Sequence, residues 1–203
     1  MLTILLLTTF LIHASYQVDN VLKVSIYYES LCPDSIRFLT NQLYPAYYKI
    51  NSSLALDFVP YGKASHTCDG DRCQFSCQHG PNECSGNKYQ ACGLKEHQSQ
   101  DQQIEFVNCV MGASNPSAES TIANCAPKLG VPIETILECA SSSKGDQILA
   151  RLGDQTHAVD PKIYFIPTIV FNDSYDFDQH WGSISDFLGT ACKALDNNNP
   201  GCK

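Results

Sequence analysis

The first clear pattern of apolar positions is a short run with rough alternation. Residues 21–28 (VLKVSIYY) are mostly β-branched or aromatic, which predicts a β-strand. Apolar residues then recur at spacings of three and four, which predicts a helix with one buried face. That face would comprise Ile36, Leu39, Leu43 and Tyr47. We expect Pro45 to kink or end this helix, and residues 54–61 to form a second strand.

The middle of the chain has a different pattern. Residues 62 to about 100 are polar, rich in Gly, Gln, His and Cys, and show little apolar periodicity. Disulfide bonds rather than an apolar core are therefore expected to hold this segment. Apolar stripes return over residues 103–153 and predict helices.

The C-terminal part predicts a strand, a turn and a last helix. Residues 163–172 form the apolar run, and its internal Pro167 fits a strand only where a turn comes directly before. Residues 173–178 predict the turn and residues 179–195 one helix. The order of elements predicts an α/β fold around a small sheet.

The N-terminus and the charge limit where the protein acts. Residues 2–12 form an apolar run shorter than the roughly 20 residues that span a bilayer, and small residues follow it. Residues 1–15 are therefore predicted to be a signal peptide, and residues 20–203 one domain without a membrane span. Two glycosylation sequons, at Asn51 and Asn172, fit export. The net charge of −8 argues against nucleic-acid binding.

Cys32 is the candidate reactive residue. It follows the first strand and precedes Pro33 at the start of a helix, whose partial positive charge favours a thiolate, although Asp34 opposes this. The alternative is that Cys32 is an ordinary disulfide partner. The chain has 11 cysteines, so at least one stays unpaired within it. If that one is Cys32, the other ten form five bridges: Cys68, Cys73, Cys77, Cys84, Cys92, Cys109, Cys125, Cys139, Cys192 and Cys202.

A zinc site is the competing interpretation of the cysteine-rich segment. Cys68, Cys73, Cys77, His79 and Cys84 have short spacings that can hold zinc. Disulfides are favoured in an exported chain, so no metal site is predicted. Cys68 and Cys73 could then pair across a short loop, and His79 is interpreted as a structural loop residue.

The segment at residues 77–92 (CQHGPNECSGNKYQAC) carries a family resemblance. It fits the pattern C-Q-H-G-x-x-E-C-x-x-N-x-x-x-x-C at every specified position. The chain thereby resembles the gamma-interferon-inducible lysosomal thiol reductase (GILT) family, and residues 25–32, 59–62 and 166–167 extend the likeness. The resemblance implies a thioredoxin-like fold with a disulfide-rich loop and helical insertion at about residues 62–160. It also implies reduction of protein disulfides in endosomes and lysosomes.

The same resemblance assigns three site residues and shows one departure. Cys32 resembles the family's attacking cysteine and Pro167 its cis-proline, but Ser35 stands in place of the second cysteine. A hydroxyl cannot resolve a mixed disulfide, so dithiol reductase activity is expected to be weak or lost. Turnover would need an external thiol such as glutathione or cysteine, with no bound cofactor. The alternative is a catalytically silent secreted glycoprotein that binds a protein partner through its surface.

Overall fold

A three-stranded sheet lies at the centre of the fold. The computed structural model describes residues 21–96, 99–197 and 199–203, so the predicted signal peptide lies outside the described residues. The strand order is β2-β1-β5, with β1 parallel to β2 and antiparallel to β5. The bounds are Leu22–Tyr28 for β1, Leu54–Pro60 for β2 and Thr168–Phe171 for β5. Both strands predicted from the N-terminal pattern are confirmed, and β5 begins directly after Pro167.

The helix that follows Cys32 continues past Pro45. Helix α1 (Pro33–Phe38) leads into a π-helical turn, Leu39–Leu43, and then into α2 (Tyr44–Ile50). Of the two outcomes expected at Pro45, the helix does not end there, and the π-helical turn directly before it is the local distortion. The wider π turn closes at Tyr44, whose N–H donates to the carbonyl of Leu39, so Pro45 enters the first turn of α2, where its missing N–H costs little.

The polar segment after β2 folds into a hairpin and a long helix. Strands β3 (Ser65–Asp69) and β4 (Arg72–Ser76) pair in antiparallel, and α3 (Pro81–Glu96) contains most of the family-like motif, the segment at residues 77–92. This helix was not predicted because several of its buried positions are polar. Glu83, Asn87 and Gln90 are each 0% exposed.

The remaining helices follow the predicted order, with one break. The helices between α3 and β5 are α4 (Gln100–Met111), α5 (Glu119–Cys125), α6 (Ile133–Ser141) and α7 (Ser143–His157). The predicted last helix is in fact two, α8 (Phe177–Ser185) and α9 (Phe187–Ala194). The chain breaks at Asp186, whose side chain accepts a hydrogen bond from the N–H of Gly189 and so caps α9.

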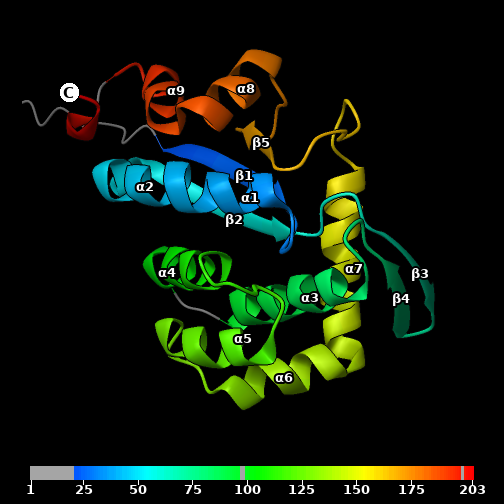
Figure 1. Cartoon of the computed structure of the whole chain (residues 1–203). Helices are drawn as coiled ribbons and strands as arrows, with labels where there is room; N and C mark the ends of the chain where they lie inside the picture. The colour runs from blue at the N-terminus through cyan, green and yellow to red at the C-terminus, as the bar shows by residue number, and fades with distance from the viewer. Residues whose placement is uncertain (1–20, 97–98, 198) are drawn as a thin grey trace, which may run out of the picture.

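The two groups of helices lie on different sides of the sheet. Helices α8 and α9 lie beside β5, whereas α3 to α6 gather below β2, and α7 runs from them back to the level of the sheet (Figure 1). Within the described ranges, no helix has both the length and the apolar character needed to cross a membrane.

Candidate active site

Cys32 lies where β1 has ended and α1 begins. Its backbone is extended (φ −71°, ψ 121°), which makes it the N-cap of α1, and Pro33 is the first helical residue. The side chain is 8% exposed and packs in an apolar cluster with Val59 and Ile166. Its Sγ lies 3.5 Å from the carbonyl oxygen of Ile166, to which the thiol can donate. The Ile166–Pro167 peptide bond is cis, so the fold brings Cys32 and the Pro167 loop together.

Ser35 lies one turn into the same helix and is fully buried. Its Oγ accepts a hydrogen bond from the N–H of Glu29 at 3.3 Å. The hydroxyl therefore holds the turn that precedes Cys32. A hydroxyl at this position can support the backbone, but it offers no sulfur to exchange with Cys32.

Helix α3 fixes that turn from the other side. The N–H of Ser30 donates to Oδ1 of Asn87 at 2.8 Å, and the Ser30 hydroxyl donates to the carbonyl of Glu83 at 3.1 Å. A Cβ on Gly86 would lie 2.5 Å from the Ser30 Oγ, so a larger residue there would push the two segments apart. Glu83 and Asn87 are specified positions of the family-like motif, which thus positions the segment that leads into Cys32.

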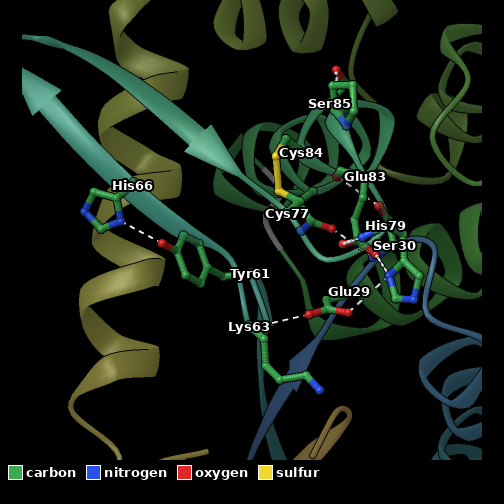
Figure 2. Close-up of a disulfide and its surroundings, with 12 residues drawn as sticks. Glu29, Ser30, Tyr61, Lys63, His66, Cys77, His79, Glu83, Cys84 and Ser85 are labelled. Atoms are coloured by element: carbon green, nitrogen blue, oxygen red, sulfur yellow. Dashed lines mark hydrogen bonds and ion pairs between the residues drawn. A yellow bond between two sulfur atoms is a disulfide. The ribbon is translucent and has the colours of Figure 1, made fainter. Parts of the chain in front are cut away.

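His79 lies between two buried carboxylates at the start of α3 (Figure 2). Its Nδ1 is 2.5 Å from Oε2 of Glu83 and 3.4 Å from Oε2 of Glu29, and its backbone N–H donates to Oε1 of Glu83 at 3.0 Å. The other oxygen of Glu29 accepts a hydrogen bond from the N–H of Lys63 at 2.7 Å.

Burial raises the pKa of Glu29; the nearby charge of Glu83 adds to the rise, and the Lys63 N–H opposes it. The sequence predicts His79 in a loop, where it lies, but does not reveal its two carboxylate partners. Glu29 lies just before Cys32 and Glu83 lies in α3. Nothing in the sequence around either residue indicates that the two carboxylates meet at His79.

Ten cysteines are joined in five disulfides, and Cys32 is left as the free one. The pairs are Cys68–Cys73, Cys77–Cys84, Cys92–Cys139, Cys109–Cys125 and Cys192–Cys202. Every cysteine of the alternative zinc interpretation is therefore in a disulfide, which leaves no thiolate there for a metal. Asn51 and Asn172, the two sequon residues, are both exposed.

Comparisons with known proteins agree on one family. The family model described as "Gamma interferon inducible lysosomal thiol reductase (GILT)" matches residues 23–129. The chain is 36% identical to a gamma-interferon-inducible lysosomal thiol reductase-like protein of Anopheles gambiae, covering 87% of this chain and 78% of that protein. It is 35% identical to GILT-like protein 1 of Drosophila melanogaster, covering 96% and 83% respectively.

Solved structures show the same fold. The chain is similar to DsbA of Chlamydia trachomatis, with a TM-score of 0.59 at 12% identity over 87% of each chain. It is also similar to MdbA of Actinomyces oris, a thiol-disulfide oxidoreductase, with a TM-score of 0.58 at 14% identity, covering 89% of this chain and 83% of that one. The predicted thioredoxin-like fold with a helical insertion is confirmed.

Proposed function

Given that this chain belongs to the gamma-interferon-inducible lysosomal thiol reductase family, we propose that it exchanges disulfides with client proteins through Cys32 alone. The observation that carries the proposal is that the one free cysteine, Cys32, is followed in the same helix by a buried serine and not by a second cysteine. Cys32 caps α1 beside the cis-proline loop, and Ser35 is buried one turn into the helix, where the family resemblance would expect a resolving thiol.

The chemistry begins with attack of the Cys32 thiolate on one sulfur of a client disulfide. The client S–S bond breaks, a Cys32–client S–S bond forms, and the second client sulfur leaves as a thiolate. An external thiolate then attacks the Cys32 sulfur and releases the client fully reduced. A second external thiol frees Cys32 and leaves as a small-molecule disulfide. Two external thiols, such as glutathione or cysteine, are oxidised for each client disulfide reduced.

Because the chain offers no second thiol at position 35, both the release of the client and the regeneration of Cys32 require collision with an external thiol. A resolving cysteine at position 35 would act at a high effective concentration, which an external thiol lacks. We therefore infer that the reductase activity of this chain is weak compared with a dithiol enzyme. The alternative is a binding module on this scaffold. The burial of Cys32 and the lack of a second thiol at position 35 also fit that alternative.

The deciding experiment restores the second thiol. Ser35→Cys should raise insulin reduction by at least tenfold, because its thiol could resolve the mixed disulfide on Cys32 within the molecule. The double variant Cys32→Ser/Ser35→Cys is the matched control and should be inactive. Denaturing, non-reducing alkylation should label only Cys32 in the wild type. No gain in a folded Ser35→Cys protein, together with no glutathione-dependent turnover in the wild type, would favour the binding module.

We further propose that the chain follows the secretory route to the cell exterior or to endosomes and lysosomes. Family relatives in Carassius auratus and Mus musculus are named lysosomal thiol reductases. Asn51 and Asn172 are exposed and could accept glycans. An amide-cleaving glycosidase should therefore lower the mass of protein exported from a eukaryotic host, and an unchanged mass would count against this route.

A further inference from the structure

One group of chemistry-bearing side chains among the described residues takes no part in the proposed exchange. Glu29, His79 and Glu83 each offer one ligand atom, and these atoms lie within 4.8 Å of one another. Glu29 follows β1, His79 lies in the turn after β4, and Glu83 lies in the first turn of α3. Two segments far apart in the sequence, the end of β1 and residues 79–83, thus place their side chains at one point, as Figure 2 shows.

Among the described residues, the two carboxylates of this group are in contact with one basic side chain, the imidazole of His79. Both carboxylates are fully buried, yet Oε2 of Glu29 accepts no hydrogen bond. Lys63 contributes its backbone N–H, and its side chain is exposed. Two buried carboxylates that share one imidazole, with one oxygen left without a hydrogen bond, are costly, so the group favours a bound proton or a bound cation.

We propose that Glu29, His79 and Glu83 form a binding site for a divalent transition-metal ion of the zinc class. One imidazole nitrogen with two carboxylate oxygens suits zinc, whereas calcium and magnesium prefer oxygen ligands alone. Two ligand atoms of a tetrahedral zinc, each about 2.0 Å from the ion, lie about 3.3 Å apart.

Two of the three distances between ligand atoms show how far they would move to accept the ion. Nδ1 of His79 already lies 3.4 Å from Oε2 of Glu29. Its 2.5 Å contact with Oε2 of Glu83 would have to open by somewhat less than 1 Å. Nδ1 must carry no proton to bind the ion, which a neutral imidazole satisfies with its proton on Nε2. The side chain of His79 is 32% exposed, which gives the ion a path of entry from solvent.

The site would join the turn after β1 to the start of α3, next to the reactive cysteine. The carbonyl of Glu29 accepts a hydrogen bond from the N–H of Cys32 at 3.3 Å, so an ion on Glu29 would brace the turn before α1. His79 and Glu83 both lie within the loop closed by the Cys77–Cys84 disulfide. Binding should therefore raise the thermal stability of the folded protein.

The test is a zinc titration of the full mature chain with its disulfides intact. A Cys32→Ser background removes the free thiol, which could itself bind zinc. We expect one zinc per chain by calorimetry and by metal analysis after dialysis, with a higher melting temperature. Glu29→Gln and His79→Asn should each weaken zinc affinity at least tenfold. Magnesium, tested in parallel, should give neither binding nor stabilisation.

Two exposed residues provide matched controls. Glu134→Gln on α6 and His157→Asn on α7 remove the same chemical groups elsewhere and should leave affinity unchanged. His79→Asn alters a partly exposed turn residue, so it keeps the test valid if Glu29→Gln fails to fold. The proposal is overturned if the background protein binds no stoichiometric zinc, or if folded His79→Asn binds zinc as tightly as the background.

Discussion

The sheet region and the inserted region of this molecule are stabilised in different ways. The sheet region consists of β1, β2 and β5 with α1, α2, α8 and α9, and contains one disulfide, Cys192–Cys202, and aromatic contacts between its elements. Phe187, for example, makes edge-on contacts with Phe38 and Phe171, with ring centroids 5.8 and 6.3 Å away. The inserted region runs from β3 to α7. It shares the same apolar core but also contains four disulfides, Cys68–Cys73, Cys77–Cys84, Cys92–Cys139 and Cys109–Cys125.

Buried charge adds to this difference. Asp146 of α7 is 1% exposed and binds Nζ of Lys88 at 2.5 Å and Nε of Arg72 at 3.1 Å. It also accepts a hydrogen bond from the N–H of Cys73 at 3.3 Å, which holds the hairpin against α7. The inserted region thus depends on covalent and polar links that an apolar pattern does not reveal.

The largest expected effect comes from the longest covalent link. Replacing Cys92 and Cys139 with alanine opens a loop with a sequence separation of 47, and chain entropy predicts a loss of about 4 kcal/mol in the free energy of unfolding. The matched variant without Cys68 and Cys73 opens a separation of only 5 and should lose about 2 kcal/mol. Urea denaturation at pH 7 measures both. Equal losses would mean that loop length does not govern the stability of this region.

The same difference decides how much of the fold could be predicted. The strands at residues 22–28 and 54–60 were found because their inward positions are apolar and of the right residue types. Helix α3 was missed because buried Gln90 satisfies its amide with the Tyr28 hydroxyl, at 2.9 Å, and with the Met111 sulfur. Such a position looks exposed in a hydrophobic pattern. The break at Asp186 was missed for a related reason, since capping competes locally with helix propagation.

The site was predictable only in part. Cys32 and Pro167 could be named from the strand-to-helix junction and from the family resemblance. The contacts of His79 with Glu29 and Glu83 could not, because they depend on how α3 approaches the end of β1. Such a long-range approach leaves no periodic signal in either segment.

The two regions meet at the turn after β2, where Gly62 lies against Glu29. Gly62 follows β2 with φ +64°, and a Cβ there would lie 2.2 Å from Cγ of Glu29. Gly62→Ala should therefore cost about 2–3 kcal/mol, from left-handed backbone strain and from displacement of Glu29. Gly70→Ala is the control, because Gly70 has φ +58° with no atom within 4 Å of the added Cβ. It should cost about 1–2 kcal/mol from the backbone alone. Equal losses in urea denaturation would show that Glu29 moves aside freely.

The smallest expected effect is a pH dependence in the sheet region. His180 of α8 is 1% exposed, and its Nδ1 accepts a hydrogen bond from the N–H of Ile169 in β5 at 3.3 Å. Burial lowers the pKa of His180 from 6.5 to about 4. Between these values the unfolded chain binds more protons than the folded one, so the free energy of unfolding decreases as the pH falls. From pH 7 to pH 5 the loss attributable to His180 should be about 1–2 kcal/mol.

His180→Asn isolates this contribution, because an amide oxygen can accept the Ile169 N–H without titrating. The free energy of unfolding of the wild type minus that of the variant should decrease by about 1–2 kcal/mol between pH 7 and pH 5. The raised pKa of Glu29 acts in the opposite direction, since the folded state then binds the additional proton, but it affects both proteins equally and cancels. His157→Asn, at an exposed position, should keep the wild-type dependence. A constant difference between wild type and His180→Asn would mean that α8 opens to let His180 ionise in the folded protein. The hydrogen bond to β5, which begins directly after Pro167, would then be lost in an acidic compartment without loss of the fold.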